Sequence, residues 1–239
     1  MDSLNLLLFT AAGTGFVHAL FGPDHYLPFI FIAKARKWSL KKTLFTTFYC
    51  GLGHLASSVI IAFVGIALGY GISQLETTLE PVESVRGNIA GWVFFLFGFS
   101  YMVWGIVRAV KNKPHAHLHS HGGGELHIHK HQHDSEHSHD ESKSGRLLTP
   151  WVLFIIFVFG PCEILIPQVM VPAAHHNISG VIAIIALFSI ATISTMCATV
   201  AIGYYGFNFL PTDKLDRFMH AIAGAIICLS GFAILFLAM

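Results

Sequence analysis

Residues 15–28 read GFVHALFGPDHYLP and lie inside an apolar run that covers residues 4–33. As a straight helix this run would be about 45 Å long, at about 1.5 Å per residue. A bilayer core is only about 30 Å thick, so one straight span cannot use the whole run. Gly22-Pro23 and Pro28 also interrupt helical hydrogen bonding. The run therefore predicts a transmembrane helix that is broken near its middle.

His18, Asp24 and His25 bring polar chemistry to this break. A carboxylate at membrane depth costs about 2.5–3.5 kcal/mol on insertion scales, so it is rarely found there without a partner. In an intact helix His18 and His25 would lie on one face, because their spacing is close to two full turns. We expect other parts of the chain to supply the groups that make these polar residues tolerable and useful at this depth.

The composition is typical of a polytopic membrane protein. Of the 239 residues, 54% are hydrophobic and 11% are charged, whereas soluble domains carry about 25% charged residues. The formal net charge of +1 gives no reason to expect a nucleic-acid partner. The N-terminus lacks a basic segment, so the first apolar run is expected to be retained rather than cleaved as a signal peptide. The cysteines lie in apolar segments and do not suggest a disulfide framework; they are Cys50, Cys162, Cys197 and Cys228.

The apolar pattern predicts six spans, at residues 4–33, 44–72, 88–108, 148–173, 178–206 and 217–238. The loops after the first, third and fifth spans hold 13 of the 14 lysines and arginines, and Arg86 is the exception. By the positive-inside rule these loops are cytoplasmic and both termini are extracytoplasmic.

Three short patterns recur in the same order in the two halves of the chain. They pair residues 22–25 with 160–163, 67–70 with 201–204, and 89–99 with 222–232. An odd number of spans separates each pair, so the second half must be inverted relative to the first. We therefore expect an all-α membrane protein with six transmembrane helices in two inverted three-helix repeats, in which helices 1 and 4 are broken. The repeats would cover residues 1–110 and 148–239.

Residues 111–147 separate the two expected repeats and are rich in histidine. They contain almost nothing apolar to bury, so we expect disorder. Neutral imidazoles bind transition metals as a class, which favours metal capture or sensing; a solvated linker is the alternative. The histidines are His115, His117, His119, His121, His127, His129, His131, His133, His137 and His139.

A second candidate metal site lies within the spans. Carboxylates that two broken helices bring together repel each other unless a proton or a cation bridges them, and added imidazole and thiolate groups suit transition metals. Alternatives stay open: the carboxylate of the first break could cap a half-helix, and the histidine of the second span could bond a neighbouring helix. The candidate ligands are His18, Asp24, His25, His54, Cys162 and Glu163.

Residues 18–25, a histidine followed shortly by Asp-His, resemble the first-helix signature of nickel/cobalt permeases. That signature has four intervening residues and this chain has five. The histidine-rich loop resembles that of NicO-type nickel/cobalt exporters. Residues 159–163 with Pro167 are similar to UreH-like and sulfite-exporter-like membrane proteins of the LysE superfamily. The resemblance implies six helices in three-helix repeats, with His18, Asp24 and His25 as metal ligands.

The pattern and the resemblance together predict a secondary transporter of a divalent transition metal rather than an enzyme. Nickel or cobalt is the expected substrate, with zinc or iron as alternatives, and no organic cofactor is expected. The chain lacks a phosphate-binding loop of the GxxxxGK[ST] kind. The remaining partners would be membrane lipid and, where the chain self-associates, a second copy of itself. Other readings are a thiol-redox conduit of the DsbD or cytochrome c biogenesis kind, a sulfite-like anion exporter, and a membrane metal sensor or store.

Overall fold

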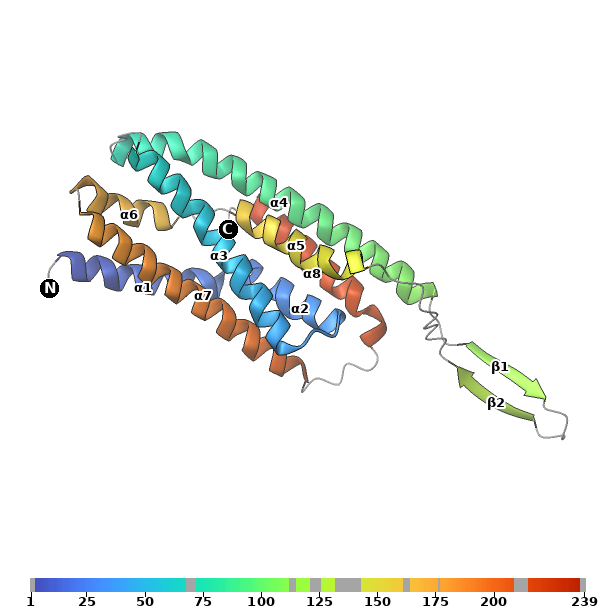
Figure 1. Ribbon diagram of the computed structural model, residues 1–239. Helices are drawn as coiled ribbons and strands as arrows, with labels where there is room; N and C mark the ends of the chain where they lie inside the picture. The colour runs from blue at the N-terminus through green and yellow to red at the C-terminus, as the bar shows by residue number, and fades with distance from the viewer. Residues whose placement is uncertain are drawn as a thin grey trace.

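A computed structural model describes residues 3–67, 72–111, 115–120, 126–131, 143–160, 164–175, 177–208 and 215–236 of the chain. Its regular elements are helices and one strand pair (Figure 1). In chain order they are α1 (Ser3–Phe21), the 3₁₀ turn η1 (Pro23–His25), α2 (Leu27–Ala35), α3 (Leu40–Ala67), α4 (Ile72–Lys111), β1 (His115–Ser120), β2 (Leu126–His131), α5 (Lys143–Phe159), α6 (Leu165–Ala174), α7 (Ile178–Asn208), the 3₁₀ turn η2 (Asp216–Phe218) and α8 (Met219–Phe236).

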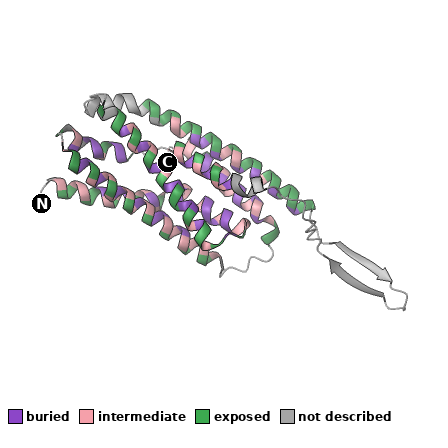
Figure 2. Ribbon diagram, viewed as in Figure 1, coloured by how far each residue is buried: buried purple, intermediate pink, exposed green. Residues whose placement is uncertain are grey.

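Five helices are long and apolar enough to cross a membrane. Large apolar side chains point outward from them: Phe9, Phe21 and Ile202 are 74%, 72% and 72% exposed. Figure 2 shows exposed residues running along the outer faces of the bundle. This surface suits lipid better than water, and it is compatible with an integral multi-pass membrane protein. The apolar stretches are Leu4–Phe21, Leu40–Val64, Ser84–Lys111, Ile178–Phe207 and Asp216–Phe236.

The fourth predicted span, residues 148–173, is divided between α5 and α6. Its apolar part in α5, Thr149–Phe159, is shorter than a single crossing requires. Residues 161–163, between the two helices, lie outside the described part of the chain. The third span also differs, because α4 begins at Ile72 rather than at residue 88 and carries Pro81 in its interior. Hydropathy finds only the apolar part of a helix, so the polar first turns of α4 were missed.

The break predicted in the first span is present between α1 and α2. At the end of α1 the Gly22 N–H donates to the His18 carbonyl at 3.0 Å. Pro23 has no N–H with which to continue the helix. One 3₁₀ turn follows, in which the His25 N–H donates to the Gly22 carbonyl at 3.0 Å. The cause is local to the Gly-Pro pair, and the prediction made from it is confirmed.

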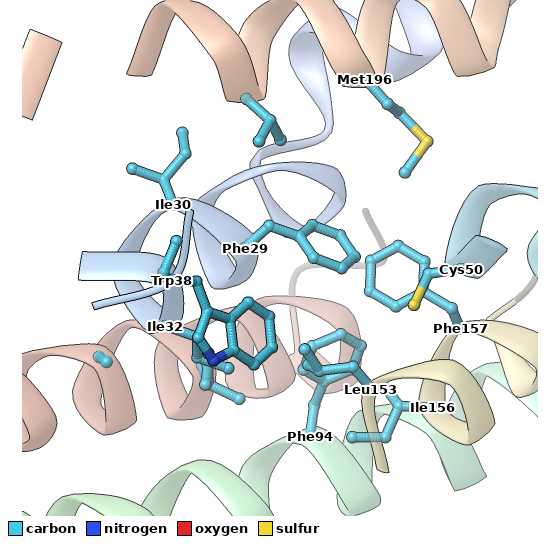
Figure 3. Close-up of a cluster of buried hydrophobic side chains, with 14 of the residues drawn as sticks. Phe29, Ile30, Ile32, Trp38, Cys50, Phe94, Leu153, Ile156, Phe157 and Met196 are labelled. Carbon is cyan, nitrogen blue, oxygen red and sulfur yellow. The ribbon is translucent and has the colours of Figure 1, made fainter. Parts of the chain in front are cut away.

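The helices pack side by side in an elongated bundle (Figure 1). α4 lies along α8 and α1 along α7, while α3 contacts both α5 and α7, and α2 packs on α7 and α8. The largest buried cluster joins side chains from several of these helices, among them Phe29, Phe94, Phe157 and Met196 (Figure 3). The ring centroid of Phe157 lies 5.0 Å from that of Phe29 and 6.3 Å from that of His25. This core therefore packs directly against the first break.

Glycines allow α4 and α8 to approach each other closely. A Cβ atom added at Gly98 would lie 2.8 Å from the Gly224 carbonyl oxygen, and one added at Gly224 would lie 2.8 Å from the Gly98 carbonyl oxygen. A Cβ added at Gly231 would lie 2.7 Å from the Gly91 carbonyl oxygen. Larger residues at these positions would push the two helices apart, as at other small-residue contacts between membrane helices.

Part of the histidine-rich loop forms a hairpin beyond the C-terminal end of α4 (Figure 1). β1 and β2 are antiparallel, and their register pairs His117 with His129 and Leu118 with Ile128. A His-x-His repeat has the period of two that a strand requires. The expectation of disorder for residues 111–147 stays a prediction. Residues 112–114, 121–125 and 132–142 lie outside the described part.

Candidate metal centre

Three histidines from two separate segments converge where the first span is broken. His18 lies in the last turn of α1, His25 ends η1, and His54 lies in the middle of α3. Each offers a ring nitrogen, and these three atoms all lie within 4.8 Å of one another. The ring centroids are 4.6 Å apart for His18 and His25, 5.2 Å for His25 and His54, and 6.1 Å for His18 and His54.

His25 is held in one orientation by Asp24 and Gly22. Its side chain is buried, and its Nδ1 lies 3.2 Å from Asp24 Oδ1. A carboxylate can only accept, so this contact puts the imidazole proton on Nδ1 and leaves a lone pair on Nε2. Nε2 is buried and has no hydrogen-bond partner. A Cβ atom at Gly22 would overlap His25 Nδ1, so only glycine lets the ring lie this close to the backbone.

His54 is held in the same way by a backbone carbonyl. It is buried, and its Nδ1 lies 3.3 Å from the carbonyl oxygen of Phe157 in the last turn of α5. A carbonyl also only accepts, so Nδ1 carries the proton and Nε2 carries the lone pair. The His54 Nε2 is likewise buried without a hydrogen-bond partner. A buried polar atom without a partner costs free energy, and two such atoms lie in one cluster.

Two phenylalanine rings flank the three histidines. The ring centroid of Phe188 lies 6.3 Å from that of His18, and Phe157 lies 6.3 Å from His25 and 6.2 Å from His54. Phe188 is fully buried. Apolar neighbours of this kind strengthen the binding of an ion by its ligands and limit access by solvent.

The cluster could hold a transition-metal ion. Histidine nitrogens bind zinc and similar ions at about 2.0–2.1 Å, which places two ligands about 3.3 Å apart in tetrahedral geometry. The ring nitrogens of His18, His25 and His54 lie up to 4.8 Å apart, so they would have to move closer together to hold such an ion. Three protein ligands leave at least one position for water or another ligand, as in sites that exchange their contents. Each of the two Nδ1–H donors already has the outer acceptor that metal-bound histidines use.

The structure brings together three of the six intramembrane candidates and gives a fourth a supporting place. His18, His25 and His54 form the cluster, and the Asp24 carboxylate contacts the His25 ring behind it. No side chain caps α2 at Tyr26, so the described residues do not show Asp24 as a helix cap. Cys162 and Glu163 lie outside the described residues, and their roles stay predictions.

The structure describes some of the loop histidines and not others. His121, His133, His137 and His139 lie outside it. The other candidates are on the two strands: His115, His117, His119, His127, His129 and His131.

Sequence reasoning missed two supporting groups at the site. The Phe157 carbonyl, which holds His54, has no sequence signal, because every residue carries a carbonyl. The second group is Arg86, for which there was a sequence signal. Its Nη2 donates to the carbonyls of Val158 and Gly160 at 3.2 Å each. Among the lysines and arginines, Arg86 alone lies outside the three basic loops.

Comparisons with protein-family models, with curated proteins and with solved structures each return no match.

Proposed function

We propose that this protein is a membrane transporter for a divalent transition-metal ion, which binds to His18, His25 and His54. One observation carries the proposal: His25 and His54 each bury an Nε2 atom without a hydrogen-bond partner, and a ring nitrogen of each lies within 4.8 Å of one of His18 inside an apolar helical bundle. A metal ion would satisfy both atoms at once. Burying them for packing alone would cost free energy without a return.

The polarity of the site favours a cation over an anion. The C-terminal turns of α1 and α5 both end at the cluster, since His18 is in one and the Phe157 carbonyl in the other. Helix C-termini carry about half a negative charge. The lone pairs of His25 and His54 accept but cannot donate, whereas an anion such as sulfite needs donors. The anion-exporter alternative is therefore less well supported.

The proposed substrate is nickel or cobalt, with zinc and iron as alternatives. Imidazole suits all four ions, and the ligand set by itself does not choose among them. The choice of nickel or cobalt rests on the resemblance of residues 18–25 to the permease signature. The histidine-rich loop, in this proposal, collects or senses the same metal on the cytoplasmic side.

We propose that the two halves of the bundle are inverted repeats that rock about the site. Gly98 contacts Gly224 and Gly231 contacts Gly91, so each contact maps onto the other when 91 is exchanged with 224 and 98 with 231. Contacts between other helices follow the same exchange. The α1–α7 contact corresponds to the α5–α3 contact, and the α2–α8 contact corresponds to the α6–α4 contact. Exchanged contacts of this kind support a two-fold relation between the halves. Inverted repeats with broken helices suit alternating access.

The test is metal accumulation in cells that express the wild type or His25→Ala, run in parallel for nickel, cobalt, zinc and iron. We expect the wild type to change the cellular content of one or two of these metals and His25→Ala to abolish the change. His175→Ala, an exposed histidine at the end of α6, is the control. Equal metal contents in all three strains for all four metals would contradict the proposal.

A further inference from the structure

Arg86 caps the end of α5 at the second Gly-Pro break. Its Nη2 donates to the carbonyl oxygens of Val158 and Gly160, at 3.2 Å each. Carbonyls in the last turn of a helix have no partner within the helix, so they need one from elsewhere. Arg86 comes from α4, and it reaches across to supply the donor.

The same guanidinium nitrogen also holds α3. Arg86 Nη2 donates to Ser57 Oγ at 2.7 Å, and Ser57 Oγ donates to the His54 carbonyl at 2.8 Å. One side chain therefore joins α4, α3 and the end of α5 at the level of His54.

His54 depends on this end of α5 for its orientation. The carbonyl that accepts its Nδ1–H belongs to Phe157, the residue immediately before Val158. The ring also lies against Gly160, where an added Cβ would be 3.1 Å from His54 Nδ1. If the last turn of α5 moved away from α3, the ring would lose its acceptor, and the proton could occupy either nitrogen.

We propose that Arg86 is a positioning residue for His54. By holding the last turn of α5 on α3, it keeps the Phe157 carbonyl in place and so keeps the lone pair of His54 on Nε2. The consequence for metal binding rests on the proposed function. The ordering of the His54 ring is a property of the metal-free protein and is testable without it.

The test measures the ring nitrogens of His54 by NMR in metal-free, detergent-solubilised protein labelled with ¹⁵N-histidine and assigned with His54→Gln. In the wild type we expect one protonated and one unprotonated nitrogen, the Nδ1–H tautomer. Arg86→Gln should give averaged shifts from two tautomers. Arg108→Gln is the matched control, since Arg108 is exposed on the same helix and its guanidinium carbon lies 5.3 Å from the Trp104 ring centroid. Arg108→Gln should give the same His54 signals as the wild type.

Ser57→Ala is a milder second variant, because it removes one acceptor of Arg86 and leaves a good helix former in its place. It should shift the His54 signals in the same direction by a smaller amount. A single Nδ1–H tautomer in both Arg86→Gln and Ser57→Ala would overturn the inference. Titration of the wild type with Co²⁺ is read separately: imidazole signals that do not respond would count against the metal site and leave the tautomer result standing.

If the wild type binds Co²⁺, Arg86→Gln should raise its Kd by about 10-fold, as loss of an outer-shell partner does. The same substitution in a His54→Ala background should add almost nothing, because Arg86 acts through His54. Additive losses would show that Arg86 acts on the fold as a whole and would also overturn the inference.

Discussion

The two Gly-Pro breaks of this chain have similar sequences and different places at the site. The first, at residues 22–25, carries His25, with His18 one turn before the break. The described part of the second, up to Gly160, contributes backbone carbonyls in place of ring nitrogens. Those carbonyls accept from His54, which belongs to α3, and from Arg86, which belongs to α4.

Both breaks nevertheless use their glycine in the same way. A Cβ at Gly22 would overlap the His25 ring, and a Cβ at Gly160 would lie 3.1 Å from the His54 ring. Each break thus seats one histidine of the cluster against its backbone. Each Gly-Pro pair therefore lies against one histidine of the cluster, whereas the packing of the neighbouring helices decides which residues contact each break.

The largest effect is expected from a substitution at the first break. His25→Ala removes a ligand candidate and leaves Asp24 without its partner. We expect Co²⁺ affinity to fall by more than about 100-fold, beyond the range of about 10–100-fold typical of outer-shell changes. Isothermal titration of the purified protein measures this, with His175→Ala as the control. An unchanged Kd would remove His25 from the site.

Alanine substitutions at Gly22 and Gly160 allow the two breaks to be compared directly. Gly22→Ala forces the His25 ring to move, and we expect Co²⁺ affinity to fall by about 10–100-fold. Gly160→Ala meets a ring at a distance that small shifts can relieve, so its effect should be several times smaller. Equal losses in the two variants, measured in the same titrations, would mean that the breaks are equivalent.

Asp24→Asn keeps the shape of the side chain and removes its charge. The amide oxygen can still accept from His25 Nδ1–H, so the ring keeps its orientation but loses the carboxylate that makes it a better ligand. We expect about 10-fold weaker Co²⁺ binding and slower metal transport. Transport is measured as metal content of expressing cells. Wild-type flux and affinity in this variant would show that the carboxylate has no part in the site.

Deleting residues 115–139 should have the smallest effect on the cluster in the bundle. The loop histidines add their own metal binding, so the deletion should lower the number of bound ions while the Kd of the remaining site changes less than about 3-fold. Competition between Co²⁺ and a chromogenic chelator resolves the two classes. Complete loss of transport would show that the loop is required for the transport step.

A good part of the fold could be predicted because it follows from local chemistry. The apolar helices come from residue composition, and the first break comes from a missing N–H at Pro23 and the neighbouring Gly22. The polar first turns of α4 and the strands at residues 115–120 and 126–131 were not predicted, because hydropathy reports only what lipid would contact.

The sequence by itself determined that the protein has membrane-compatible helices, that the first is interrupted, and that His18 and His25 meet at the interruption. Only the tertiary structure decided that His54 joins them, that Asp24 stands behind His25, and that Phe157 and Arg86 orient His54. The reason is distance along the chain: His54 and its acceptor are 103 residues apart. Such pairs form only when α3, α4 and α5 pack together, and no local pattern of residues specifies that packing.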